Sequence, residues 1–303
     1  MALFSAPQRY SSRISIIGED TPVARALPYR DRRTVGAWCF LDHAGPKQFA
    51  PGKGMHVGAH PHIGLQTFTW LIEGEVVHRD SLGNEQIIRP GQVNLMTAGR
   101  GISHTEDSLH DGTRLHAAQL WIALPKEVHE CDPAFDNYPD LPIVQADGFQ
   151  GTVLAGTAWG QTSPATIYSP LVGIDLAASG SARTEIALQT DFEYAAMALR
   201  GSLTVGGETL QPGEWLYFSP GRTTLPISCD AEAQLLLLGG TPFEEELIIW
   251  WNFVARTQHE IEQALADWNA QPDKGGRFGS VYPGSVAAPL SAPSLDGVRL
   301  RPD

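Results

Sequence analysis

Residues 60–62 read His-Pro-His and residues 104–106 read His-Thr-Glu, so two short segments carry three imidazoles and one carboxylate. Within each segment the two candidate side chains are two positions apart. On a β-strand, residues two apart point to the same face, so each pair can aim both side chains at one point. The spacing therefore predicts a metal site inside a β-barrel, formed by His60, His62, His104 and Glu106.

The types of ligand also limit which metal can be the cofactor. Imidazole is a borderline ligand, so three histidines and a carboxylate favour a divalent transition metal over Mg or Ca. The order of affinities does not choose among Fe, Mn, Co, Ni, Cu and Zn. With four protein ligands, an octahedral metal keeps two open positions, which suit a small-molecule substrate and O2. A purely structural site is less expected, because structural sites are usually closed.

Composition favours a globular all-β protein. The chain has 303 residues, 42% of them hydrophobic, with 31 Gly and 22 Pro, which imply many turns, and it shows few long helical patterns. The net charge of −13 argues against direct nucleic-acid binding, because phosphate neutralisation needs clustered Lys and Arg. Three widely spaced cysteines indicate reduced intracellular thiols. We see no signal peptide and no membrane span, and expect a cytoplasmic monomer.

A weak internal repeat indicates two barrels of one design. Residues 90–100 and 212–222 both read as Pro-Gly turn, strand, Gly-Arg turn. We therefore predict an N-terminal metal-binding barrel over residues 1–135. A second barrel, with a helix and tail, is expected over 136–303. Nine of the ten histidines lie at or before residue 129, and aligning the repeats sets Pro226 opposite His104 and Ser228 opposite Glu106. The second barrel is therefore expected to lack the metal ligands.

One clear helix is predicted after the second barrel. Thr257 and Glu260 fit a capping box. An apolar stripe at helical spacing follows, formed by Ile261, Ala264, Leu265 and Trp268. Pro272 and the Gly275-Gly276 pair are expected to end the helix, and the last 30 or so residues read as an extended tail. A short strand pair is expected near residues 142–144 and 152–155.

Other histidines have simpler interpretations. His78 is expected to face outward or to pair with Asp80. His116 is expected to line the barrel or to support a ligand as a hydrogen-bond partner. We interpret His43 as structural, and His56, close to the ligands in sequence, as a candidate for the pocket mouth.

The motifs together resemble the pirin family of the cupin superfamily. The resemblance is dense from about residue 22 to residue 125 and looser over the second half. Its main segments are His60-Pro-His62-Ile-Gly64, Glu73-Gly74-Glu75, His78-Arg-Asp-Ser-Leu-Gly-Asn84, Met96-Thr-Ala-Gly-Arg-Gly101 and His104-Thr-Glu106. The resemblance implies an all-β bicupin with a short C-terminal helix and one metal in the N-terminal barrel. The family's metal is usually iron, so Fe(II) is the expected cofactor.

The resemblance also implies two hypotheses about function. Some members resemble quercetin 2,3-dioxygenase in activity and open a flavonol ring with O2, releasing carbon monoxide. On this hypothesis the substrate is an enolic aromatic, and Glu106 is the catalytic general base. Other members act as transcription cofactors or bind metabolic enzymes. The alternative is therefore a regulatory protein whose metal responds to redox state and whose partner is another protein.

The chain departs from the family pattern beside the ligands. The family commonly has Arg-Gly-Phe-Glu after His-Pro-His, whereas this chain has Ile63-Gly64-Leu65-Gln66. Asn94-Leu95 similarly replaces a Gln-Trp pair. Losing an Arg and a Glu removes a charge pair, so the substrate preference of better-known members does not transfer directly.

Overall fold

The computed structural model describes residues 5–18, 21–270 and 276–302, and it divides the chain into two compact units. One unit, here the N-terminal barrel unit, comprises Ser15–Val23, Ala44–Asn137 and Glu244–Asp303. The other, the C-terminal barrel unit, comprises Met1–Ile14, Ala24–His43 and Tyr138–Phe243. The chain passes from one unit to the other beside the boundary expected at 135/136. Segments near both ends of the sequence belong to the unit formed mainly by the other half of the chain. Met1–Ile14 belongs to the C-terminal barrel unit, and Glu244–Asp303, with the helix and tail, belongs to the N-terminal barrel unit.

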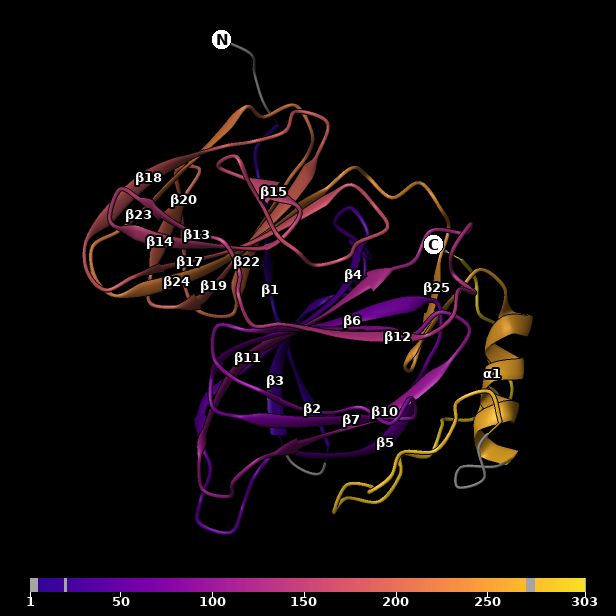
Figure 1. The fold of residues 1–303 in the computed structure, drawn as a ribbon. Coiled ribbons are helices and arrows are strands. Elements are labelled where there is room, and N and C mark those ends of the chain that lie inside the picture. Colours follow the sequence, from indigo (N-terminus) through magenta and orange to yellow (C-terminus); the bar gives the residue numbers. More distant parts are fainter. Residues whose placement is uncertain (1–4, 19–20, 271–275, 303) are drawn as a thin grey trace. The chain divides into compact units, whose positions relative to one another are not determined.

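The N-terminal barrel unit is built from two antiparallel sheets (Figure 1). The four-stranded sheet has the order β5-β10-β7-β8, and the seven-stranded sheet has the order β12-β9-β6-β11-β4-β3-β2. In the small sheet the bounds are β5 His56–His62, β10 Ile102–Ser108, β7 Val76–Asp80 and β8 Glu85–Ile88. In the large sheet they are β12 Ala134–Tyr138, β9 Val93–Thr97, β6 Leu65–Glu73, β11 Arg114–Ala123, β4 Trp38–Gln48, β3 Thr21–Leu27 and β2 Arg13–Ile17. Parts of β3 and β4 fall within Ala24–His43, which the division assigns to the other unit.

The C-terminal barrel unit repeats this strand order. Its small sheet runs β18-β23-β20-β21, and its large sheet runs β1-β22-β19-β24-β17-β14-β13. The bounds in the small sheet are β18 Ala182–Ala187, β23 Thr224–Cys229, β20 Leu203–Val205 and β21 Glu208–Leu210. In the large sheet they are β1 Gln8–Ser11, β22 Glu214–Phe218, β19 Glu193–Arg200, β24 Ala233–Gly240, β17 Leu171–Ala178, β14 Phe149–Ala155 and β13 Ile143–Ala146. A two-stranded ribbon, β15 Thr157–Ala158 with β16 Gln161–Thr162, completes the unit. Two barrels of one strand order confirm the predicted all-β bicupin.

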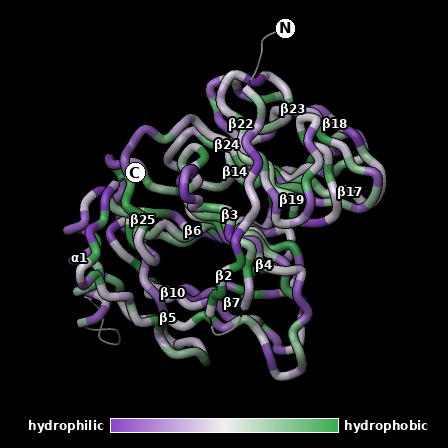
Figure 2. Tube along the Cα trace, turned by 180° about the vertical axis from the view of Figure 1, so that it is seen from behind, coloured by the Kyte–Doolittle hydropathy of each residue, from purple (hydrophilic) through white to green (hydrophobic). Residues whose placement is uncertain are grey.

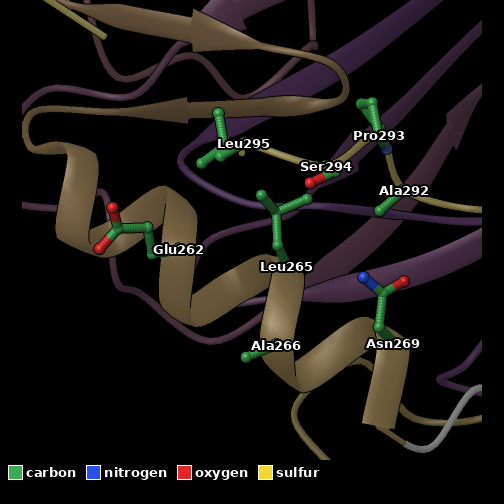
Figure 3. A pocket seen from close by; sticks show the side chains of 8 residues that line it. All are labelled: Glu262, Leu265, Ala266, Asn269, Ala292, Pro293, Ser294 and Leu295. Atoms are coloured by element: carbon green, nitrogen blue, oxygen red, sulfur yellow. The ribbon is translucent and has the colours of Figure 1, made fainter. Parts of the chain in front are cut away.

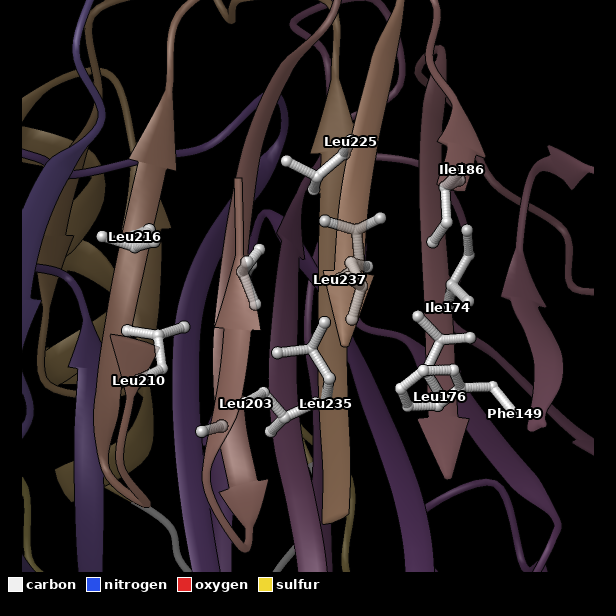
Figure 4. Close-up of a cluster of buried hydrophobic side chains, with 14 of the residues drawn as sticks. Phe149, Ile174, Leu176, Ile186, Leu203, Leu210, Leu216, Leu225, Leu235 and Leu237 are labelled. Carbon is white, nitrogen blue, oxygen red and sulfur yellow. The ribbon is translucent and has the colours of Figure 1, made fainter. Parts of the chain in front are cut away.

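Apolar side chains fill the interior of the C-terminal barrel unit (Figure 4). Figure 2 shows that hydrophobic residues are concentrated along strands such as β19. Burying each Leu side chain contributes roughly 1.5–3 kcal/mol. The inward residues of β23 are Leu225 and Ile227, whereas Pro226 is exposed. Pro226 therefore occupies the outer face and is not the counterpart of the inward His104, so the alignment was one position out of register. The one group of candidate metal ligands found among the described residues, His60, His62 and His104, lies in the N-terminal barrel unit.

The predicted helix is α1, Gln258–Ala270, with Thr257 as its N-cap, and the reciprocal bond from Glu260 goes to the residue before the cap. The Thr257 hydroxyl accepts from the N–H of Glu260 at 3.2 Å, and the Glu260 carboxylate accepts from the N–H of Arg256 at 3.2 Å. The predicted stripe is the buried face, and it packs against β26 in a second apolar cluster. Figure 3 shows Leu265 pointing toward the tail segment that carries Ser294, beside a pocket of about 280 Å³.

The remaining ribbon of the N-terminal barrel unit is the hairpin of β25, Ile248–Trp250, and β26, Phe253–Ala255. Of the predicted helix end, Pro272 and Gly275 lie outside the described residues. The tail contains no strand or helix in its described part, residues 276–302, as expected. Across the described residues, no helix combines the length and the apolar character that crossing a membrane requires.

Candidate metal centre

Strands β5 and β10 bring three histidines together. The two strands pair antiparallel with His104 directly opposite His60, so both side chains project to the same face. His62 follows two residues after His60 on β5 and shares that face. Their exposed fractions are 6% for His60, 2% for His62 and 1% for His104. One ring nitrogen of each lies within 4.8 Å of those of the other two, an arrangement that could hold a metal ion.

In His60 and His62, the Nδ1 atom is hydrogen-bonded to a backbone carbonyl oxygen. His60 Nδ1 lies 2.9 Å from the Gly58 oxygen, and His62 Nδ1 lies 3.0 Å from the Asn252 oxygen. A carbonyl oxygen can only accept, so each Nδ1 carries the proton and each Nε2 of a neutral ring holds a lone pair. This is the arrangement that orients and fixes metal-binding histidines in known sites.

Burial keeps these rings neutral. Desolvation lowers the pKa of His60 to about 4. It also lowers the pKa values of His62 and His104 well below the ordinary range, with a further contribution from neighbouring imidazoles. The neutral form is the one that binds metals. Meanwhile His62 Nε2 and His104 Nε2 lie only 3.1 Å apart. A close pair of ring nitrogens among neutral, buried imidazoles fits a divalent transition-metal ion.

Glu106 lies on β10 beyond an irregularity in the pairing. The β5–β10 register shifts between His104 and Glu106, where Glu106 pairs with Val57. Burial raises the pKa of Glu106 to about 7, and the neighbouring Asp107 charge adds to the effect. The group of ligand atoms within 4.8 Å comprises the three histidines and not this carboxylate. The role of Glu106 as fourth ligand or as general base remains a prediction.

Ile63 and Gln66, which replace the Arg and Glu common in the family, are not part of the histidine cluster. Ile63 is 3% exposed and belongs to the apolar cluster beneath α1, where it also bridges to Phe253 of β26. Gln66 on β6 is fully buried, and its amide donates to the Thr97 hydroxyl on β9 at 2.9 Å. The residues that replace the family's Arg and Glu are therefore held by packing and by the sheet.

The other histidines are also accounted for. His78 does not face outward: it is 3% exposed and pairs with Asp80, with 3.1 Å between His78 Nε2 and Asp80 Oδ2. His116 on β11 is fully buried, and His43 is buried in the C-terminal barrel unit. His56 pairs with Asp107 through its Nδ1 at 2.9 Å.

Sequence reasoning missed Asn252. This residue lies in the turn of the β25–β26 hairpin, next to Trp251, whose φ of 53° is unusual for a large side chain. Its carbonyl reaches a histidine 190 positions earlier in the chain. The only signal in the sequence was a single polar residue within the apolar run Leu247–Val254. Such a signal does not predict a contact with a residue 190 positions away.

The tail, also in this unit, crosses the outer face of the strands that carry the histidines. The Leu290 N–H donates to the Ala59 oxygen at 2.9 Å, and the Ser103 hydroxyl donates to the Phe278 oxygen at 3.0 Å. Ala59 precedes His60, and Ser103 precedes His104, so the tail contacts both histidine-bearing strands directly beside these residues. The tail thus braces the site from outside the barrel.

Comparisons with known proteins agree with this architecture. Residues 20–122 match the family model described as Pirin, and residues 173–274 match the one described as Pirin C-terminal cupin domain. A Pseudomonas aeruginosa protein, provisionally named a quercetin 2,3-dioxygenase, is 51% identical over 93% of this chain and 90% of its own length. A pirin-like protein of Caulobacter vibrioides is 40% identical over 82% of this chain and 88% of its own length.

A solved structure extends the agreement to three dimensions. A crystal structure of quercetin 2,3-dioxygenase from Acinetobacter baumannii matches with a TM-score of 0.93 and 48% sequence identity. The match covers 98% of this chain and 97% of that one, so it includes both barrels and the C-terminal helix.

Proposed function

The chain belongs to the pirin family of cupin proteins, and on that premise we propose that it is a metal-dependent dioxygenase. The proposed reaction is O2-dependent ring opening of a quercetin-type flavonol or a similar enolic aromatic. The observation that carries the proposal is the buried cluster of three neutral imidazoles in a chain so similar to proteins named for this activity. The donor set alone admits several transition metals, and the one proposed is Fe(II), the usual metal of the pirin family.

Each residue has a defined task in the proposed reaction. His60, His62 and His104 would hold the metal through Nε2, with Glu106 as the proposed fourth ligand. A bound divalent metal supplies a Lewis acid that lowers the pKa of a coordinated enolic hydroxyl. Where Glu106 does not hold the metal, it would instead accept the proton of that hydroxyl at its carboxylate, a role that suits a carboxyl whose pKa is about 7 in the metal-free protein.

The protein also controls the surroundings of the substrate. The three rings are almost completely removed from solvent, which strengthens electrostatic interactions at the site. The Trp121 ring packs edge-on against His62, with 5.3 Å between the ring centroids. An apolar wall of this kind suits an aromatic substrate better than a charged one.

The test begins with metal analysis of the purified protein, followed by anaerobic titration with quercetin and then admission of O2. Turnover with release of carbon monoxide is the expected result. His62→Ala is expected to lose metal and turnover together, whereas His110→Ala, at an exposed position, is expected to keep both.

Activity in metal-free protein would contradict the proposed mechanism. A metal-loaded protein that binds quercetin without turning it over would favour the alternative, a regulatory protein that responds to the state of its metal. A protein that binds neither metal nor quercetin would exclude both.

A further inference from the structure

Two further residues of the barrel, His78 and Asp80, lie beside the histidine cluster on strand β7. In the β7–β10 register, Asp80 is opposite His104 and His78 is opposite Glu106, so both side chains point to the face that carries the cluster. Their exposed fractions are 3% for His78 and 1% for Asp80. Buried polar groups at such positions need defined hydrogen-bond partners.

Asp80 is fixed by the turn that follows it. Its Oδ1 accepts from the backbone N–H groups of Leu82 at 2.9 Å and Asn84 at 3.2 Å, and from the Asn84 side-chain amide at 3.1 Å. Burial acts to raise the pKa of Asp80, but hydrogen bonds from His78 and Asn84 outweigh it and hold that pKa below its ordinary value. Asp80 is therefore a carboxylate with one defined orientation.

The orientation of Asp80 determines where the protons lie in the neighbouring rings. Asp80 Oδ2 can only accept, so His78 Nε2, 3.1 Å away, carries a proton. His78 Nδ1 lies 3.2 Å from His104 Nδ1, and in the metal-binding arrangement it accepts the proton that His104 carries there. That leaves the lone pair of His104 on Nε2, the nitrogen that faces His62.

We propose that His78 and Asp80 are positioning residues that hold His104 in its metal-binding tautomer. The proposal rests on the metal site of the proposed function. His60 and His62 reach the same tautomer by donating to neutral carbonyls, whereas His104 donates to an imidazole backed by a carboxylate. Phe135 stacks on His78, with centroids 4.3 Å apart, and fixes its plane.

The exchange Asp80→Asn tests the proposal because it reverses the chain of donors. Two backbone N–H groups bind Oδ1, so the introduced amide keeps its oxygen there and turns its NH2 toward His78 Nε2. The Asn84 amide, which donates to Oδ2 at 2.9 Å in the wild type, then has to move away from that NH2. His78 then accepts at Nε2 and carries its proton on Nδ1, facing His104. His104 in turn accepts at Nδ1 and carries its proton on Nε2, which blocks the metal position. Asp80→Ala removes the carboxylate without imposing this reversal.

Two measurements follow the effect. Nitrogen-15 NMR of the histidine rings in metal-free protein reports which nitrogen carries each proton. We expect His104 protonated on Nδ1 and His78 on Nε2 in the wild type, with both reversed in Asp80→Asn. Calorimetric titration with Co2+ is expected to show an affinity 10–100-fold lower for Asp80→Asn than for the wild type, the usual effect of losing a partner of a metal ligand.

The order of the two variants separates positioning from a structural role. Asp80→Ala loses the turn contacts and is expected to unfold at lower urea concentration, yet to bind Co2+ more tightly than Asp80→Asn. A purely structural role predicts the opposite order of Co2+ affinity, because Asn preserves the shape of Asp. His78→Ala, which keeps the turn, is expected to weaken Co2+ binding by 10–100-fold.

The outcomes also separate this proposal from the proposed function. If the wild-type protein did not bind Co2+, the proposed metal site would be contradicted. The NMR measurement would still show which nitrogens of His78 and His104 carry the protons. Wild-type Co2+ binding with unchanged affinity in Asp80→Asn and His78→Ala would overturn the positioning role. Finding His78 protonated on both nitrogens in the wild type would overturn it as well.

Discussion

At the scale of single residues, the site is defined by hydrogen bonds that leave one nitrogen free on each ring. His60 and His62 donate to carbonyl oxygens that belong to the fold itself, at Gly58 and Asn252. Neither carbonyl can be removed by a side-chain substitution. The orientation of these two rings is therefore protected against mutation of the partner, whereas His104 Nδ1 contacts a side chain, His78, which a mutation can remove.

The raised pKa of Glu106 predicts a pH-dependent contribution to stability in metal-free protein. Its folded pKa is about 7, against an ordinary value of 4.5, so the folded state holds this proton more tightly. The contribution is complete below pH 4.5 and is lost as pH rises to 7. Relative to Glu106→Gln, the wild type is expected to lose up to roughly 3 kcal/mol of unfolding free energy over this range.

Urea unfolding of the two metal-free proteins at several pH values measures this difference. Glu106→Gln is the matched control because the amide has the same shape and does not titrate. Parallel profiles for the two proteins would show that Glu106 titrates normally in the folded state.

The sequence was informative about residues where local geometry decides the outcome. Two strand positions separated by one residue share a face, and this alone predicts that His60 and His62 converge. His78 and Asp80 have the same spacing, yet their contact with the site depends on the β7–β10 register, which long-range pairing sets. The carbonyl of Asn252 carries no side-chain signal at all, so no pattern of residue types could reveal it.

At the scale of elements, the β25–β26 hairpin connects the metal site to α1. Val254 donates to the Ile63 oxygen at 3.1 Å, so the hairpin lies directly beside the residue that follows His62. Gly64 has a φ of 68°, and a Cβ there would collide with the Val254 oxygen. Only glycine allows this close approach.

Gly64→Ala is expected to push the hairpin away and weaken both stability and metal binding. The matched control is Gly91→Ala, because Gly91 has a φ of 81° with open space around its Cβ position. The control is expected to cost about 1–2 kcal/mol from backbone strain alone. Gly64→Ala should cost more in urea unfolding and should also reduce Co2+ affinity. Equal behaviour of the two variants would mean that the hairpin contact does not support the site.

The capping box of α1 gives a second prediction at this scale. Thr257→Ala removes the hydroxyl that accepts from the Glu260 N–H, and is expected to lower the unfolding free energy by about 1 kcal/mol. Thr257→Ser keeps that hydroxyl and is expected to restore most of the loss. Urea unfolding measures both, and identical stability of Ala and Ser at this position would contradict the role of the cap.

Elements were predictable to the extent that their signals are local. The helix carries its own capping residues and its own apolar stripe, and both match the structure. The repeat alignment failed by one position at Pro226, because a strand's facing is determined by its pairing and not by turn motifs alone. A one-residue slip exchanges the two faces of a strand.

At the scale of the whole molecule, buried histidines make the metal-free protein sensitive to acid. Burial lowers the pKa of His43 and of His60 to about 4, and those of His62 and His104 well below their ordinary value. The unfolded chain therefore takes up more protons, and stability that is complete above pH 6.5 is lost as pH falls toward 4. A single histidine with a shift of this size contributes roughly 3 kcal/mol.

A metal should oppose this loss, because three of the four rings are its proposed ligands. With Co2+ at one hundred times its dissociation constant, the folded state is expected to gain about 2.7 kcal/mol. Thermal unfolding near pH 7, with and without Co2+, measures the gain, and His62→Ala is the control that should lose it. Equal shifts in wild type and His62→Ala would indicate binding elsewhere.

The interleaving of the two units has a consequence for the order in which the protein is made. The unit that holds the histidines also includes the segment that begins at Glu244, which is synthesised after Tyr138–Phe243 of the other unit. The carbonyl that fixes His62 is synthesised 190 residues after it. His60 and His104 can meet early, but the contact that fixes His62 forms only after residue 252 has been made. Completion of the candidate metal site is therefore expected to follow synthesis of Tyr138–Phe243, and a chain interrupted before Asn252 would carry all three histidines without the carbonyl that fixes His62.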